Sequence, residues 1–294
     1  SNDNNATPAG SLDNPFPSGL LKPVGNAAGE LAGIGQGVSA YDLQARSTLV
    51  QQYSFDVQRQ LGGGIALAMG YVGSKSTHLV QGTGNININQ LDPQFLSLGS
   101  ALNQSVANPM AGKGGLFAVA SATISRSQFL RPFPQFTSVT LQNSDKSRAL
   151  YHSFFARAQK RMGQGLSMIA TYTWSLNQDS SFSGAGNVYS GQPGTAQNNY
   201  DLEAEYGLST SHTPHRLSTA ITYELPFGKG RLFLANNRWL DYAVGGWSIN
   251  TVGTFQTGFP LAITQVNNNS VIGTSVQRPN ASGSSPKTEG SLTD

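Results

Sequence analysis

The 294-residue chain has 11% charged residues, against about 25% in a typical soluble domain, and it is rich in glycine, with 34 residues. Its net charge is only +3, and its densest basic cluster is Arg157, Lys160 and Arg161, without interleaved aromatic residues, so the composition argues against a nucleic-acid partner. The absence of cysteine excludes disulfides, thiolate metal sites and a cysteine nucleophile, whereas 14 Phe, 10 Tyr and 3 Trp argue against disorder of the whole chain.

The first part of the chain, residues 1–45, has no apolar periodicity, and we expect a loop or flexible segment there. No apolar run approaches the roughly 18 residues of a membrane-spanning helix. The chain begins with Ser1-Asn2-Asp3 and shows no signal peptide, so we expect its natural N-terminus to lie elsewhere.

Residues 46–265 contain six segments in which apolar and polar residues alternate with period two, and we predict each to be a β-strand. The segment that begins at His215 is an example: Leu217, Ile221 and Tyr223 fall on one face, and Thr222 and Glu224 fall on the other. The predicted strands cover about 48–60, 65–76, 149–161, 166–177, 215–225 and 245–257.

The predicted strands run to 10–13 residues, whereas strands of globular proteins usually have about five or six. Short turns at 61–64, 162–165 and 226–230 alternate with long loops at about 77–148 and 178–213. We expect a short helical turn within 91–105, and a polar loop or flexible tail over 266–294.

Short turns at one end and long loops at the other are typical of an outer-membrane barrel. The predicted fold is therefore all-β: a partial barrel of about six antiparallel, up-and-down transmembrane strands with long extracellular loops. The alternation alone also fits a soluble β-sandwich, in which the polar face would meet water. Aromatic residues near the strand ends favour the barrel; these are Tyr71, Tyr172, Trp174, Tyr223, Phe227, Trp247 and Phe255.

Six stretches also resemble, in order, the barrel of the Oar-like TonB-dependent outer-membrane transporters. They are "VQQYSFDVQRQLGGGIALAMGYVGSKSTHL" (50–79), "NININQLDP" (85–93), "LRPFPQFTSVT" (130–140), "YHSFFARAQKRMGQGLSMIATYTWS" (151–175), "HRLSTAITYELPFGKGR" (215–231) and "GGWSINTVGTFQTGFPLAI" (245–263).

This resemblance implies a non-enzymatic receptor in the outer membrane that binds an extracellular substrate and imports it with energy supplied through TonB. It implies outer-membrane lipid, TonB and an unknown extracellular substrate as partners, and no cofactor. We find no plug, TonB box or regulatory-like domain in the sequence, and six strands cannot close a barrel of roughly 22 strands. The C-terminus also lacks a terminal strand ending in an aromatic residue, so we expect a barrel-domain fragment.

Candidate sites are few. His212 and His215 flank Thr213-Pro214 at a spacing that two metal ligands can have, but a polar role at a strand end is favoured. His78 and His152 are isolated, and we interpret both as loop or strand-end residues. The acidic cluster "DLEAEY" (201–206) has carboxylates of the kind used in glycoside hydrolysis or Ca²⁺ binding, yet a solvated loop is the default, and no G-x-S-x-G motif is present. We assign no catalytic, cofactor-binding or metal-binding residue.

The remaining motifs have simpler interpretations. "GIGQG" (33–37) and "GGG" (62–64) lack the Lys-Ser/Thr of a phosphate loop, so we expect a flexible loop and a tight turn. Asn-x-Ser/Thr sites at Asn5, Asn103, Asn268 and Asn280 are expected by chance. Phe129, Phe133, Phe136 and the asparagines 267–269 suit either ligand contact or loop packing, and the ligand-binding residues stay unassigned.

The sequence thus predicts part of a TonB-dependent receptor barrel. The alternatives are a soluble or secreted β-rich surface protein (adhesin- or filament-like), a secreted β-fold hydrolase and a non-barrel assembly. The barrel hypothesis places Leu217, Ile221, Tyr223 and Leu225 toward lipid and the turn at 226–230 at the periplasmic rim. A charge at Ile221 is then expected to block membrane assembly, while a charge at Thr222 is tolerated.

Overall fold

The structure is a computed structural model. It describes residues 13–14, 16, 19, 29–80, 85–113, 121–180, 196–228, 231–233, 245–261, 263, 265, 270–272, 277–279 and 283.

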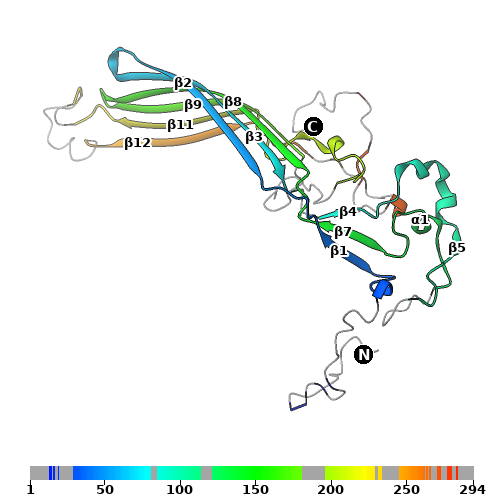
Figure 1. Cartoon of the computed structure of the whole chain (residues 1–294). Coiled ribbons are helices and arrows are strands. Elements are labelled where there is room, and N and C mark those ends of the chain that lie inside the picture. The colour runs from blue at the N-terminus through cyan, green and yellow to red at the C-terminus, as the bar shows by residue number, and fades with distance from the viewer. Residues whose placement is uncertain are drawn as a thin grey trace, which may run out of the picture.

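Six long strands form one curved antiparallel sheet (Figure 1). They are β2 (Leu49–Gln60), β3 (Ile65–Leu79), β8 (Ser147–Gly163), β9 (Leu166–Asp179), β11 (His215–Glu224) and β12 (Ser248–Gln256), in the spatial order β12-β11-β9-β8-β3-β2. A short strand, β10 (Gly207–Leu208), pairs with the end of β9. All six predicted strands, and the all-β antiparallel fold class, are confirmed.

Tight turns join the strands at one end of the sheet. Between β2 and β3 lies the 3₁₀ turn η2 (Gly62–Gly64), in which Gly63 and Gly64 have φ of 72° and 73°. Between β8 and β9 the chain turns at Gln164 and Gly165, with φ of 51° and 81°. Positive φ favours glycine, which explains why the sequence places glycine clusters at these turns.

The opposite end carries a separate folded part, which we call the loop assembly (Figure 1). Its sheet has β1 (Gly37–Tyr41) parallel to β7 (Ser138–Gln142), which is antiparallel to β4 (Asn85–Asn87). A second pair joins β5 (Ser105–Ala107) and β6 (Thr123–Ser125). The helical turns are η1 (Gly29–Leu31), η3 (Pro93–Asn103), α1 (Arg126–Phe129), η4 (Glu203–Glu205) and η5 (Ser270–Ile272).

The loop assembly differs from the loops expected from sequence. β1 lies inside the segment 1–45, and β4 to β7 lie inside 77–148, both of which we expected to be irregular. The helical turn expected within 91–105 is present as η3. Part of the C-terminal segment also packs: Val271 is 8% exposed and joins the core that Leu91 and Leu102 form.

The described part of the chain places its apolar core in the loop assembly and not in the long sheet. Its buried apolar residues are Ile34, Ile86, Leu91, Leu102, Val139, Ala196 and Val271. None of these lies in the six long strands. No helix of the described residues is long and apolar enough to cross a membrane.

Candidate functional site

The register of the long sheet gathers its apolar side chains on one side, which we call the apolar face. Directly paired residues of antiparallel strands point to the same side. One row across the sheet therefore holds Phe55, Tyr71, Phe154 and Trp174, and the next holds Val57, Met69, Ala156, Tyr172, Leu217 and Phe255. Leu217, Ile221 and Tyr223 share this face, as the alternation predicted.

The apolar face is uncovered. Phe55 is 71% exposed, Trp174 58% and Phe255 67%, and the described residues place no second layer over them. A soluble β-sandwich would bury such a face against a second sheet. An exposed apolar surface of this extent instead marks contact with lipid or with a partner.

The height of the apolar face matches a bilayer. On β3, Lys75 points to this face near the loop assembly; near the turns, the cations of this face are Arg59, which pairs with Leu67, and Lys160, which pairs with Ile65. The eight to ten positions from these pairs to residue 75 are about 26–33 Å along a strand. At a strand tilt of about 40°, this corresponds to about 20–25 Å, near the usual apolar height of an outer-membrane barrel.

The other side of the sheet, the polar face, carries amides, hydroxyls and charges. Its members include Gln52, Asp56, Gln58, Arg157, Thr171, Arg216, Ser218, Thr222 and Glu224. Phe155 also points to this side, and its ring covers Gly70, where an added Cβ would lie 2.7 Å from ring atoms. The Arg157 guanidinium carbon lies 6.0 Å from the centre of the same ring.

The four histidines have structural contacts at or near strand ends. His212 is buried, and its Nδ1 accepts a hydrogen bond of 3.2 Å from the Asn177 main-chain N–H. His215 Nδ1 lies 2.8 Å from the Tyr172 hydroxyl, and His152 Nδ1 bonds the Tyr71 hydroxyl. Within the described residues, no group of three or more His, Cys, Asp or Glu side chains could hold a metal ion.

The acidic cluster at 201–206 connects the loop assembly to β8 and to residue 278. Glu203 accepts a hydrogen bond of 2.5 Å from Arg148, whose guanidinium carbon lies 4.4 Å from the centre of the Tyr206 ring. Glu205 is buried and forms an ion pair with Arg278. These carboxylates therefore hold loops in place, where sequence alone suggested a solvated loop or a carboxylate site.

Asp145 joins the loop assembly to the sheet. Its side chain is 2% exposed and accepts hydrogen bonds from the Arg46 main-chain N–H (3.1 Å) and Nε (3.2 Å). His78 Nδ1 lies 3.2 Å and Lys146 Nζ 3.3 Å from its oxygens. Burial alone would raise the pKa of Asp145, but the bonds from Arg46 and Lys146 outweigh burial and lower it to about 2.

Two buried amides organise the centre of the loop assembly. Asn89, with 0% exposure, donates from Nδ2 to the carbonyl oxygens of Phe133 (3.0 Å) and Phe136 (2.8 Å), and its Oδ1 accepts from the Phe133 N–H. Gln90 is equally buried. Its amide donates to Asn198 Oδ1 at 2.7 Å and accepts from the Asn199 N–H at 2.7 Å.

A tyrosine completes this network. The Tyr200 hydroxyl donates to the Gln90 carbonyl oxygen at 3.2 Å. Burial raises the pKa of Tyr200, and the nearby charge of Asp92 adds to this effect, so the hydroxyl keeps its proton. Our sequence interpretation assigned no role to Asn89, Gln90 or Tyr200. The stretch "NININQLDP" (85–93) carried part of the family resemblance but gave no residue a role, and the alternation in "NININQ" (85–90) is too short to separate from chance.

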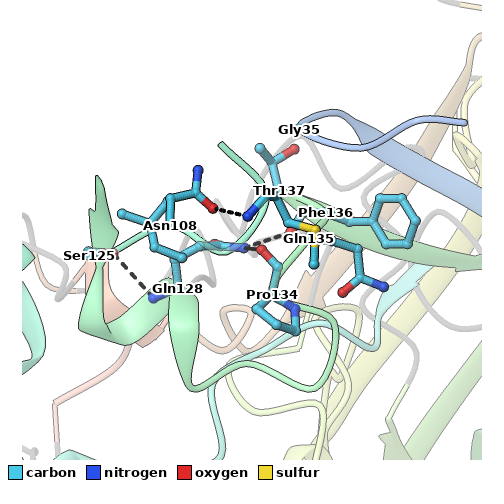
Figure 2. Close-up of a pocket in the computed structure, with 10 residues that line it drawn as sticks. Gly35, Asn108, Ser125, Gln128, Pro134, Gln135, Phe136 and Thr137 are labelled. Atoms are coloured by element: carbon cyan, nitrogen blue, oxygen red, sulfur yellow. Dashed lines mark hydrogen bonds between the residues drawn. The ribbon is translucent and has the colours of Figure 1, made fainter. Parts of the chain in front are cut away.

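A pocket of about 360 Å³ lies beside this network, between β6, α1, the segment that follows β5 and residues 134–137 (Figure 2). The Gln128 amide reaches across to the carbonyl oxygens of Pro134 (2.9 Å) and Phe136 (2.7 Å). Met110 and Ile124 add apolar surface, and no charged side chain is among the described residues that line the pocket. Such a pocket suits an uncharged ligand.

Of the aromatic residues proposed from sequence for ligand contact or loop packing, the structure places Phe136 at this pocket. Phe129 and Phe133 are 46% and 37% exposed and do not line it. The asparagines 267–269 lie outside the described residues, as do Asn5 and Asn280, whereas Asn103 is exposed at the end of η3.

The two glycine-rich motifs have structural roles. In "GIGQG" (33–37), Ile34 is buried and the Gly35 N–H donates to the Gln135 carbonyl oxygen at 2.8 Å, so this segment packs against the wall of the pocket. "GGG" (62–64) forms the turn between β2 and β3, as predicted.

Comparison with known proteins agrees with this geometry. A family model described as an outer membrane beta barrel domain matches residues 1–294. No curated protein and no solved structure matches the chain. The long antiparallel strands, the uncovered apolar face and the whole-length match lead to one conclusion: the chain belongs to the outer-membrane β-barrel domain family.

Proposed function

We propose that the chain is part of the barrel of a TonB-dependent receptor that binds an extracellular substrate and imports it without chemical conversion. The observation that carries this proposal is the packed loop assembly with its uncharged pocket, at one end of a sheet whose apolar face has the height of a bilayer. The ordered resemblance of six stretches to Oar-like transporters supports the TonB-dependent class.

The loop assembly lies on the extracellular side, and the glycine turns lie at the periplasmic rim. Outer-membrane barrels have long loops outside and short turns inside, which supports this orientation. The apolar face then contacts lipid and the polar face lines the lumen. The chain's own contribution is passive: the loops meet the substrate, and TonB supplies the energy for import.

The orientation is testable because the chain has no cysteine of its own. Asn103→Cys places a thiol on the exposed end of η3, and Gly62→Cys places one in the β2–β3 turn, where a Cβ meets open space. A membrane-impermeant maleimide should label the first variant in intact cells and the second only after permeabilisation. The opposite labelling pattern would reverse the orientation.

Import is tested by growth. Cells of the source organism that lack this gene, and cells that lack tonB, should be compared on a panel of single nutrient sources. We expect every nutrient that the first strain fails to use also to fail in the tonB strain. A nutrient defect without a counterpart in the tonB strain, or purification as a monodisperse soluble monomer without detergent, would contradict the proposal.

A further inference from the structure

The apolar face is hollowed near the loop assembly. A cavity of about 300 Å³ opens there, between β3, β8 and β9. Its walls are Tyr71, His152, Phe154, Trp174 and Leu176, with the backbone of Ser153 and Ser175 as its floor. The surface is almost entirely apolar, and Trp174 is 58% exposed. Its size and lining suit part of an acyl chain.

The wall also contains one oriented polar group. The Tyr71 hydroxyl bonds His152 Nδ1, and the two ring centres are 6.0 Å apart. In the tautomer in which Nδ1 accepts the tyrosine proton, the neutral ring carries its hydrogen on Nε2. Within the described part of the chain, Nε2 has no hydrogen-bond partner. In that tautomer, the His152 ring beside the cavity offers one N–H donor.

On the same face, Lys75 lies one row of paired residues closer to the loop assembly than His152 does. Lys75 pairs with Leu150, while Gly73 pairs with His152, so Lys75 and His152 are diagonal neighbours. Diagonal positions in a sheet are about 7–8 Å apart, within reach of a lysine side chain. Lys75 is exposed and has no ion-pair partner among the described residues.

Among the described residues of the long strands, the other outward-facing cation at this end is already neutralised. Arg148 lies on β8 two residues before Leu150, and it is bonded to Glu203. Lys75 therefore provides the uncompensated positive charge at the edge of the apolar band. In a bilayer that edge lies at the depth of the lipid phosphates, where a lysine near an anionic surface contributes attraction.

We propose that this cavity binds a membrane lipid with a net anionic phosphate headgroup, with an acyl chain between Phe154, Trp174 and Leu176 and the phosphate on Lys75 Nζ and the His152 Nε2–H. A membrane lipid fits because the apolar cavity and the two donors open on the same lipid-facing side. The inference requires only the outer-membrane location, so it stands or falls separately from TonB-dependent import.

The test uses Trp174 as the reporter. Trp239→Phe and Trp247→Phe leave Trp174 as the single tryptophan of the full chain. Its fluorescence quenching is then titrated in detergent with phosphatidic acid carrying dibrominated chains, and with phosphatidylcholine carrying the same chains. We expect half-quenching by phosphatidic acid at about one-fifth of the concentration that phosphatidylcholine requires, the factor of one lysine near an anionic headgroup.

Matched variants distinguish a specific lipid site at Lys75 from a general effect of positive charge on lipid binding. Lys75→Gln should remove the preference for phosphatidic acid, and Lys75→Arg should keep it. Arg59→Gln removes a cation from the same face at its turn-side edge, opposite Leu67, and should leave the preference unchanged. Equal quenching by both lipids would reduce the contact to ordinary bilayer lipid and overturn the proposal, as would equal losses in the Lys75→Gln and Arg59→Gln variants.

Discussion

The long sheet and the loop assembly are stabilised in opposite ways. The sheet exposes its largest apolar side chains, and the described residues give it no apolar core of its own. The loop assembly buries a few apolar residues around Leu91 and Leu102, together with Asn89, Gln90, Asp145 and Glu205. The sheet therefore depends on its surroundings, while the loop assembly depends on hydrogen bonds that the chain supplies itself.

This difference indicates where sequence changes will act. On the sheet, the side of the strand on which a residue lies should decide the effect, since only one face meets lipid. In the loop assembly, hydrogen-bonding capacity should decide it, because a buried polar group without a partner costs about 1–3 kcal/mol. Four substitutions test this contrast, in order of decreasing effect.

The largest effect is expected from Leu217→Lys. Leu217 pairs with Tyr172 and Phe255 in the row that contains Met69, near the middle of the apolar band. Ile221, the site predicted from sequence, lies in the row of Lys160, closer to the edge. We expect Leu217→Lys to cost about 2–4 kcal/mol in a urea unfolding equilibrium in detergent, and Ile221→Lys less.

Ser218→Lys is the matched control, because Ser218 lies on the polar face between Thr171 and Thr254. It should assemble nearly as well as the unmodified chain, as should Thr222→Lys. If Ser218→Lys lowered the free energy of unfolding more than Leu217→Lys does, the assignment of the two faces would be reversed.

Asn89→Ala should disrupt the loop assembly and leave the sheet intact. It removes the two hydrogen bonds to the Phe133 and Phe136 carbonyl oxygens and the one from the Phe133 N–H, at a cost of about 2–3 kcal/mol. Limited proteolysis should then cut within 126–142, with unchanged β-sheet circular dichroism. Asn103→Ala, at an exposed position of η3, serves as the control.

Asp145 makes the junction between the two regions sensitive to acid. Its pKa is about 2 in the folded chain and 3.8 ordinarily, so the ionised form contributes stability that is complete above about pH 3.8 and lost as the pH falls through 2. The groups facing it are Arg46, His78 and Lys146. Asp145→Asn should weaken the junction by about 1–2 kcal/mol.

Pepsin, which is active at low pH, provides the measurement. Cleavage within 42–48 should rise between pH 4 and pH 2 in the unmodified chain. In the Asp145→Asn variant, cleavage within 42–48 should be high over the whole range from pH 4 to pH 2, because no carboxylate at position 145 is left to be protonated. A wild-type pH profile identical in shape to that of the variant would exclude Asp145 as the cause.

The smallest effect is expected from Tyr172→Phe, which removes the exposed 2.8 Å bond to His215 and keeps the aromatic ring. We expect about 0.5 kcal/mol by urea unfolding in detergent. A loss as large as that of Leu217→Lys would mean that hydrogen bonds and not lipid contact stabilise the sheet, and would remove the contrast between the two regions.

The long strands were predictable because each contains 9 to 17 residues of alternating pattern, and period two identifies both the strand and its faces. The predicted starts of β2, β3, β9 and β11 fall within one residue of the observed ones. Strand order followed in part from the tight turns, which force consecutive strands to pair.

The loop assembly was not predictable by the same means. β1 and β4 have five and three residues, and their pairing with β7 joins segments about 50 to 100 positions apart. Short strands leave too little periodicity, and distant pairing leaves no local signal. Buried amides such as Asn89 and Gln90 look, in sequence, like the exposed asparagines and glutamines that are abundant in this chain.

Two glycines of β3 affect the register in which the neighbouring strands pair with it. The Tyr53 ring of β2 covers Gly73, and the Phe155 ring of β8 covers Gly70 on the opposite side; an added Cβ would lie 2.2 Å and 2.7 Å from ring atoms. Sliding β2 by two residues would place Tyr53 against a side chain instead of an open backbone. The two glycines therefore favour a single register of β2 and of β8 against β3 when the strands pair during assembly.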